Sequence, residues 1–81
     1  MNSKQLRLVW DFRGPDSTPT ATHFLEHLKS YLSRPENNIV QWSDTGITSQ
    51  NELWSSCYLI IQESNLEKIK TDLKPHRGNY L

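Results

Sequence analysis

One pentapeptide, HFLEH at residues 23–27, carries the side chains best suited to chemistry. Its two histidines are four positions apart, a spacing that brings two side chains together on one side of a helix. Imidazole nitrogen is a common ligand for zinc and other transition metals. Glu26 stands between the histidines and is a candidate base for activating a metal-bound water. The pattern therefore predicts, as one alternative, a metal site at His23 and His27 with Glu26 beside it.

The order of letters, H-x-x-E-H, resembles the motif of the inverzincin metallopeptidases. The resemblance implies that His23 and His27 bind zinc and that Glu26 activates water. It covers five residues, and that family also uses a further carboxylate ligand from a second helix of a far longer domain. Glu63 and Glu67 are the downstream candidates for that ligand. A metal-binding protein or metal-dependent hydrolase is therefore the alternative function.

An apolar stripe defines the helix that must carry HFLEH. Thr18 is suited to cap this helix and Pro19 to open it, and the helix should run to about Arg34. Both histidines of the pentapeptide fall outside the stripe, so we favour a solvated pair over a metal site in a shaped cavity. His76 or Asp16 is the candidate third ligand, if the fold brings either one close. The stripe consists of Ala21, Phe24, Leu25, Leu28 and Leu32.

The stretch RGPDSTPT, which precedes this helix, is a second candidate site. Free backbone N–H groups at the start of a helix attract anions. Gly14 stands alone, so the stretch lacks the glycines with which a P-loop wraps a phosphate. An ordinary capped turn is the competing explanation. The side chains that would contact a small anionic ligand here are Arg13, Ser17, Thr18 and Thr20.

Composition argues against several classes of partner. Nine Lys and Arg balance nine Asp and Glu in 81 residues, so no net charge attracts nucleic acid or an anionic membrane. The longest apolar run, residues 58–61, is far shorter than the roughly 20 residues that cross a bilayer. Cys57 is the single cysteine and lies in an apolar run, which indicates a buried thiol in a reducing compartment. We expect a cytoplasmic protein that binds neither nucleic acid nor membrane.

Four aromatic residues, Trp10, Trp42, Trp54 and Tyr58, fall in expected strands. Sheets that bind RNA stack bases on such rings and surround them with basic residues. The second and third expected strands contain no Lys or Arg. We therefore predict that at least two of the tryptophans pack in the core.

Periodicity predicts one α+β domain spanning residues 1–81. The expected elements are a strand at 5–13, a helix at about 19–34, a strand at 39–42, a strand at 54–62 and a helix opened by the capping box at 64–67. Residues 44–53 are expected to form a long mobile loop and residues 75–81 a C-terminal tail. The order β-α-β-β-α indicates a ferredoxin-like, split βαβ, two-layer sandwich with the last strand absent or reduced to the tail.

Two helices on one sheet face would leave the other face uncovered. Val9 would lie there, together with either Trp54, Tyr58 and Ile60 or Cys57, Leu59 and Ile61. An exposed apolar patch of this kind marks a partner surface, so we expect a homodimer through the sheet face or an edge. With no catalytic constellation and no cofactor beyond weak zinc binding at the histidine pair, the preferred function is a small binding or interaction domain.

Overall fold

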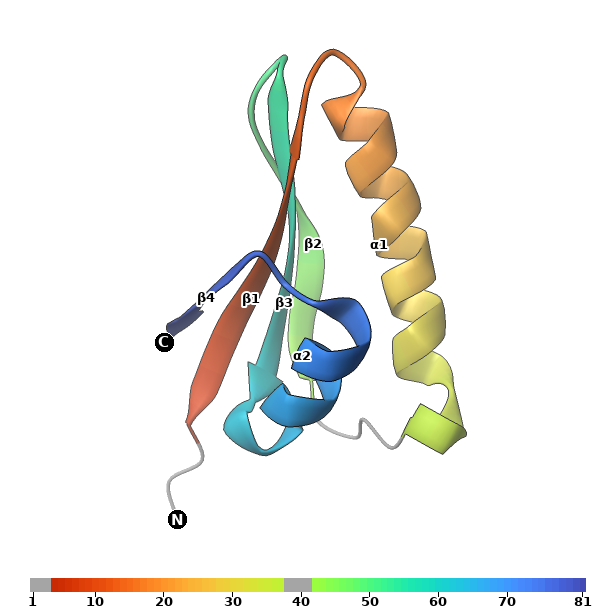
Figure 1. Ribbon diagram of the computed structural model, residues 1–81, viewed down its shortest axis with the longest axis vertical. Helices are drawn as coiled ribbons and strands as arrows, with labels where there is room; N and C mark the ends of the chain where they lie inside the picture. Colours follow the sequence, from red (N-terminus) through yellow and green to blue (C-terminus); the bar gives the residue numbers. More distant parts are fainter. Residues whose placement is uncertain (1–3, 38–41) are drawn as a thin grey trace.

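The computed structural model describes residues 4–37 and 42–81. Within these ranges the chain forms a four-stranded antiparallel sheet and two α-helices (Figure 1). The sheet order is β2-β3-β1-β4, and the small α+β architecture expected from the sequence is confirmed. The elements in chain order are β1 (Gln5–Arg13), α1 (Ser17–Ser33), β2 (Trp42–Asn51), β3 (Trp54–Gln62), α2 (Leu66–Leu73) and β4 (Arg77–Tyr80). Short 3-10 turns occupy Pro35–Asn37 and Glu63–Asn65.

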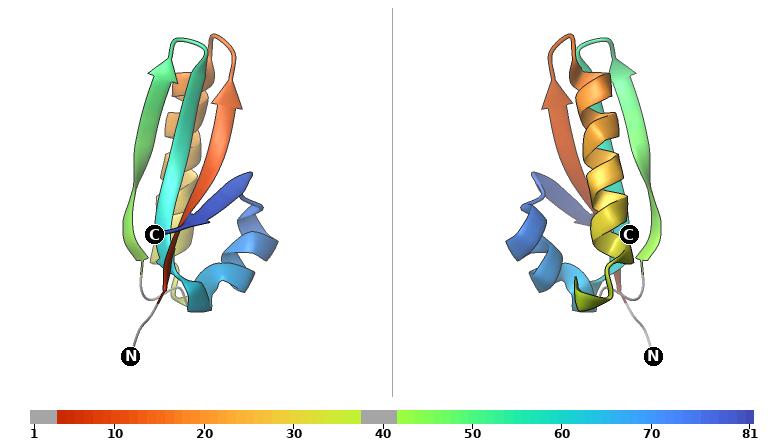
Figure 2. Two further views of the ribbon diagram at one scale, coloured as in Figure 1. Left: turned by 90° about the vertical axis from the view of Figure 1, so that its left-hand side faces the viewer. Right: turned by 90° about the vertical axis from the view of Figure 1, so that its right-hand side faces the viewer.

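The inner strands β1 and β3 pair over their whole length, from Gln5 opposite Gln62 to Arg13 opposite Trp54. Both were predicted with these bounds, because each has the alternation or apolar content of a strand with a buried face. Alternation divides β1 into two sets of side chains. One set packs in the core beside the helices, and the other lies on the face that neither α1 nor α2 covers; Figure 2 shows both helices on one side of the sheet.

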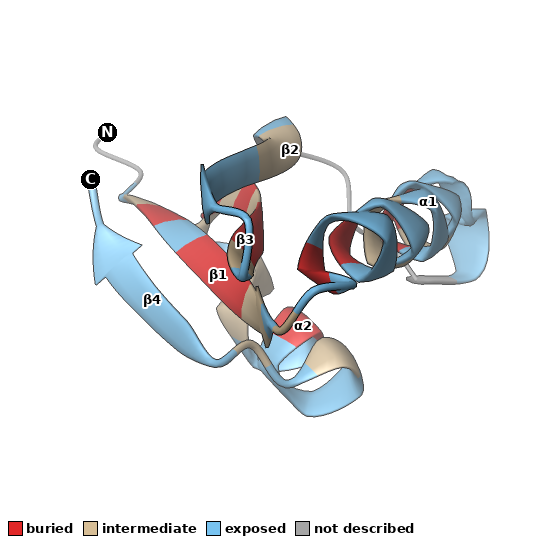
Figure 3. Cartoon of the chain, turned by 90° about the horizontal axis from the view of Figure 1, so that it is seen from above, coloured by how far each residue is buried: buried red, intermediate tan, exposed pale blue. Residues whose placement is uncertain are grey.

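Both helices pack on the same face of the sheet and enclose one hydrophobic core. Buried positions concentrate in β1, β3 and the helix sides turned toward them (Figure 3). Aromatic rings close the core beside α1, where Phe24 lies 5.0 Å from the ring of Trp10 and 5.6 Å from that of Phe12. The central cluster consists of Leu8, Trp10, Leu28, Leu32, Cys57, Leu59, Ile61 and Ile69.

The predicted loop at residues 44–53 is wrong, because β2 continues to Asn51 and turns through Glu52 and Leu53 into β3. The stretch DTGITSQN has little apolar periodicity, so its strand character comes from pairing with β3 along most of its length. The amide oxygen of Asn51 fixes the turn by accepting the backbone N–H of Leu53 at 2.8 Å. Of the strand expected at 39–42, residues 39–41 lie outside the described residues, and Trp42 begins β2.

The helix starts also differ from expectation. Helix α1 begins at Ser17 with Asp16 as its N-cap, so Thr18 is not the cap. Helix α2 follows a 3-10 turn, its N-cap is Asn65, and no side-chain cap hydrogen bond is made there. The expected capping box at 64–67 is therefore replaced by a tighter first turn, which is common at helix starts.

The C-terminal tail forms a fourth strand, β4, on the outer edge of β1. Lys74 ends α2 in the left-handed conformation, with φ of 49°. Backbone bonds then tie the tail to β1, including Leu81 N to Gln5 O at 2.9 Å. The Tyr80 hydroxyl adds a bond to Glu63 at 2.6 Å. These bonds hold β4 against the start of β1, although every residue of β4 is exposed.

Candidate functional site

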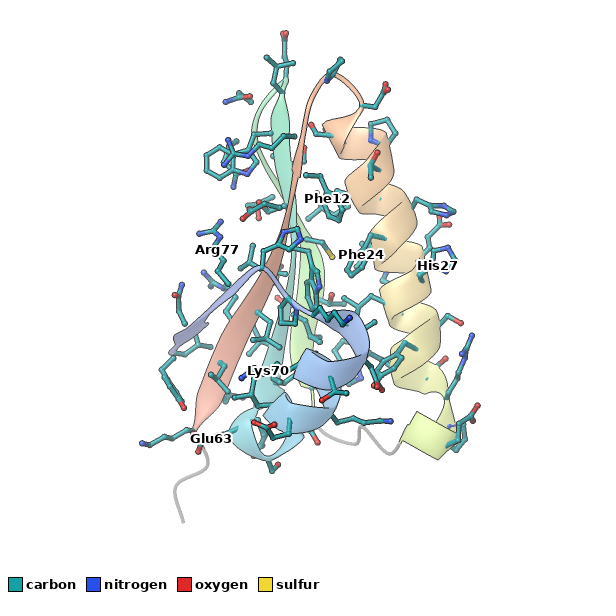
Figure 4. The ribbon with its side chains drawn as sticks, viewed as in Figure 1. Phe12, Phe24, His27, Glu63, Lys70 and Arg77 are labelled. Atoms are coloured by element: carbon teal, nitrogen blue, oxygen red, sulfur yellow. The ribbon has the colours of Figure 1, made fainter. Side chains whose placement is uncertain are left out.

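The open face of the sheet carries a groove of about 390 Å³. Its apolar part is formed by Val9, Tyr58 and Ile60, and its cations are Arg7 and Arg77. The Asp44 carboxylate of β2 also lines the groove, and hydroxyl and amide side chains from β2, β3 and β4 supply the remaining polar groups. Figure 4 shows the side chain of Arg77 on the side of the sheet opposite α1. The groove therefore combines an apolar surface with cationic and hydrogen-bonding groups from all four strands.

One carboxylate, Asp11 of β1, organises this face. Its Oδ2 accepts a hydrogen bond from Arg77 Nε at 3.0 Å, and its Oδ1 accepts one from Arg77 Nη2 at 3.1 Å. The same Oδ1 accepts the Ser56 hydroxyl at 2.6 Å and the Trp54 indole N–H at 3.2 Å. Burial alone would raise the pKa of Asp11, but these hydrogen bonds and the charge of Arg77 lower it to about 2. Asp11 is thus held ionised and fixes three side chains around it.

A guanidinium lies over each of the two aromatic rings of this face. Arg13 lies 4.0 Å from the centroid of the Trp54 ring, and Arg7 lies 5.9 Å from that of Tyr58. Both distances are within the range of cation–π attraction. Among residues 4–37 and 42–81, neither guanidinium has a carboxylate within ion-pair distance.

The ring of Tyr58 lies close against Gly46 of β2. A Cβ at that glycine would lie 2.9 Å from the tyrosine oxygen, so a larger residue would displace the ring. The Tyr58 hydroxyl donates to Asp44 Oδ2 at 3.2 Å. Burial and the adjacent Asp44 carboxylate raise the pKa of Tyr58. The tyrosine is therefore held by its neighbours on β2.

The predicted patch is less apolar than expected, because charged and polar side chains share this face with Val9, Tyr58 and Ile60. Val9 is only 6% exposed. It lies between Tyr58 and Arg77 in the strand registers, and these long side chains cover it. Of the two alternative sets on β3, Cys57, Leu59 and Ile61 face the helices, and Trp54, Tyr58 and Ile60 lie half-buried on the open face.

The histidines of HFLEH lie on the exposed side of α1, and Figure 4 shows His27 pointing away from the sheet. Their Nε2 atoms are 2.9 Å apart and share a hydrogen bond. In the described part of the chain, no group of three His, Cys, Asp or Glu residues could hold a metal. The candidate third ligands His76, Asp16, Glu63 and Glu67 therefore do not complete the site. His76 instead accepts the backbone N–H of Asp11 through Nδ1 at 2.8 Å.

The four residues predicted to bind an anion at the strand-to-helix turn do not converge. Ser17 is 1% exposed, and its hydroxyl donates to that of Ser55 at 3.5 Å. The Thr18 hydroxyl lies 2.8 Å from the same Ser55 oxygen. Arg13 lies on the other face of the sheet, over Trp54, and Thr20 is exposed on α1. The hydroxyls of buried Ser17 and exposed Thr18 anchor the helix start to β3, which explains them without a ligand.

The core predictions for cysteine and tryptophan have mixed outcomes. Cys57 is fully buried, and burial raises its pKa to about 11, as expected for an inert thiol. Trp10 is also buried, and its indole N–H donates to the carbonyl of Leu73 at 2.9 Å. Trp54 lies on the open face instead, and Trp42 is 40% exposed. The expectation of at least two core tryptophans is therefore wrong.

The sequence did not single out Asp11 or Arg77 as site residues. Alternation in β1 placed Arg7, Asp11 and Arg13 on one face, but Arg77 lies 66 positions from Asp11 and reaches it only through the β1–β4 pairing. The signal that could have revealed this site is an acidic residue within the buried part of a strand, because such a residue needs partners.

Comparison with protein families, curated proteins and solved structures finds no significant match to this chain. Within the described residues, no helix has the length and apolar content needed to cross a membrane.

Proposed function

We propose that the protein is a small binding domain whose groove on the open sheet face receives an anionic group attached to an apolar body. The observation that carries this proposal is the placement of Arg7 and Arg77 beside Val9, Tyr58 and Ile60 in one groove. Small-molecule sites are mostly apolar hollows of about 300–1,000 Å³ with a few placed polar groups. At about 390 Å³, this groove suits a single ring or side chain with one carboxylate or phosphate.

Preorganisation supports the same proposal. Asp11 holds Arg77 by two hydrogen bonds, so a ligand would not need to order that side chain on binding. Arg7 has no carboxylate partner within residues 4–37 and 42–81, so we assign it the direct contact with the anion. The aromatic rings of this face already lie against guanidinium groups, which weighs against stacking of nucleic-acid bases on them.

Three finer proposals accompany the binding function. The architecture is a ferredoxin-like split βαβ, which the strand order supports because β3 lies between β1 and β2 and β1 lies between β3 and β4. The protein forms a homodimer through β2, since this ten-residue edge strand has no Lys or Pro to oppose strand pairing. Its location is cytoplasmic, as the buried free thiol of Cys57 suits a reducing compartment. Light scattering at two protein concentrations tests the dimer.

The binding experiment is a titration followed by ¹⁵N–¹H NMR, with phenyl phosphate as the probe and benzyl alcohol as the uncharged control. We expect phenyl phosphate to shift the amide signals of Arg7, Tyr58 and Arg77, and benzyl alcohol to bind at least about tenfold more weakly, a difference of roughly 1.4 kcal/mol. Arg7→Gln should remove this preference for the anion. Arg34→Gln, which changes an exposed arginine at the end of α1, should leave it intact.

Several outcomes would contradict the proposal. Equal binding of phenyl phosphate and benzyl alcohol would remove the role of the cations. If Arg7→Gln and Arg34→Gln weakened the binding of phenyl phosphate equally, the anion would be responding to the overall charge of the protein and not to a site at Arg7. A third titration, with an oligothymidylate of eight nucleotides, should give no shifts in the groove; saturable shifts there would show that the face binds nucleic acid.

A further inference from the structure

The histidine pair on α1 has a geometry that the groove does not use. His23 and His27 place their Nε2 atoms 2.9 Å apart, with ring centroids 4.5 Å apart and planes at 77°. Both residues are exposed, and Figure 4 shows His27 on the side of α1 turned away from the sheet. The two nitrogens that could bind a metal therefore already lie side by side on the exposed surface of α1.

The distance between the two nitrogens favours one coordination geometry over another. With metal–nitrogen bonds of about 2.0 Å, two cis ligands at 90° have their nitrogens about 2.8 Å apart, whereas two ligands at the tetrahedral angle have them about 3.3 Å apart. The observed 2.9 Å is close to the cis value. Tetragonal sites of nitrogen and oxygen ligands are typical of Cu²⁺ and Ni²⁺, and Cu²⁺ forms the most stable complexes of the divalent series.

We propose that His23 and His27 chelate Cu²⁺ through their Nε2 atoms, with water in the remaining positions. Two copper–nitrogen bonds form and two water molecules leave the hydrated ion. The ring that donates the hydrogen bond takes the tautomer with its proton on Nδ1, so the proton stays on that ring. Each ring turns by about 45° from the line joining the nitrogens, a rotation that the broad terminal torsion of histidine allows.

The helix supplies the rigidity that makes two exposed side chains a chelate. Ala21 and Leu28, which flank the pair in sequence, are 0% and 1% exposed and fix α1 against the sheet. The two Cβ positions therefore stay at helical spacing, and binding through the second nitrogen is intramolecular. A site with two protein ligands and open water positions binds metal without the third ligand that a zinc hydrolase needs, so this proposal is independent of the hydrolase alternative.

The test is a Cu²⁺ titration of the full chain by calorimetry in a weakly coordinating buffer, with electron paramagnetic resonance of the one-to-one complex. We expect nitrogen hyperfine structure from two imidazoles. His23→Gln and His27→Gln should each weaken binding roughly 100-fold, because either change removes the chelate. His76→Gln is the matched control, since it removes an imidazole elsewhere, and should change the affinity less than about threefold.

A second measurement needs no variant. Substoichiometric Cu²⁺ should broaden the NMR signals of residues around His23 and His27 before any others, since paramagnetic broadening falls steeply with distance. Broadening centred elsewhere, a spectrum with a single nitrogen ligand, or an equal loss of affinity in His76→Gln would overturn the proposal. Circular dichroism of each variant shows whether α1 is retained, and because both histidines are exposed we expect no loss of helix.

Discussion

Replacing Asp11 by Asn tests whether this carboxylate organises the open face. The substitution keeps the size of the side chain but removes the charge that pairs with Arg77, and it places an amide where Oδ1 or Oδ2 now accepts hydrogen bonds. Ser56 and Trp54 can still donate to the remaining amide oxygen. The substitution therefore removes mainly the ionic interaction between Asp11 and Arg77.

The expected magnitude follows from the pKa of Asp11, which is lowered from 3.8 to about 2. At about 1.4 kcal/mol per pH unit, ionised Asp11 contributes about 2 kcal/mol to the free energy of unfolding. Its side chain is 19% exposed, so solvent screening reduces this value only modestly. Because the folded pKa lies below the unfolded one, the contribution is present above pH 4 and disappears as the pH falls through 2. About 1 kcal/mol of it is lost between pH 7 and pH 3.

Urea unfolding followed by tryptophan fluorescence measures this difference at pH 7 and pH 3. We expect Asp11→Asn to cost about 2 kcal/mol at pH 7 and about 1 kcal/mol at pH 3, so that the two proteins converge in acid. Asp16→Asn is the matched control: it removes an exposed carboxylate that makes no side-chain cap hydrogen bond, and it should change the free energy of unfolding at pH 7 by less than about 0.5 kcal/mol. A penalty for Asp11→Asn that is the same at both pH values would refute the electrostatic role.

Two further predictions concern the core thiol and the contact between β2 and β3. Because burial raises the pKa of Cys57 to about 11, its thiolate fraction at pH 8 is about 0.001, and its reaction with a thiol reagent should be at least about 100-fold slower in the native protein than in denaturant; a fast native reaction would contradict this burial. Gly46→Ala should destabilise the protein by about 1 kcal/mol because its Cβ displaces Tyr58, and in a Tyr58→Leu background the same change should be neutral or stabilising. A double-mutant cycle of urea unfolding that gives no coupling between the two sites would show that the ring moves aside freely.

The parts of the fold that periodicity predicted are those that bury a regular apolar set. Strands β1 and β3 and the stripe of α1 were found because their side chains enter the core. Most of β2 was predicted as a loop, and β4 was left open between a tail and a strand, for the opposite reason. Their residues are mostly exposed, and they are strands because the edges of β3 and β1 offer backbone partners. Pairing of that kind is tertiary information that a local pattern does not contain.

The candidate sites also divide into contacts set by local spacing and contacts set by tertiary pairing. Helical spacing brought His23 and His27 within hydrogen-bond distance, since that contact depends only on local geometry. Arg13 and Ser17, which the sequence grouped at one turn, do not lie together. Arg13 belongs to the outward-facing set of β1, whereas Ser17 starts α1 on the other face of the sheet. The pairing of Asp11 with Arg77 depends on β4 and could not be predicted from β1 alone.

The side chains of the open face pair with one another, so this face does not need α1 or α2 to cover it. Asp11, Val9 and Arg7 of β1 lie opposite Ser56, Tyr58 and Ile60 of β3. Arg7 lies over the Tyr58 ring, and the Ser56 hydroxyl binds the Asp11 carboxylate. Solubility alone would need only scattered surface charges, whose ion pairs contribute about 0–1 kcal/mol each. A single carboxylate that accepts four hydrogen bonds fixes the positions of its neighbours more tightly than solvation requires. Fixed cations beside an apolar groove lower the entropic cost of binding a ligand, and this is the physical reason to look for function on this face.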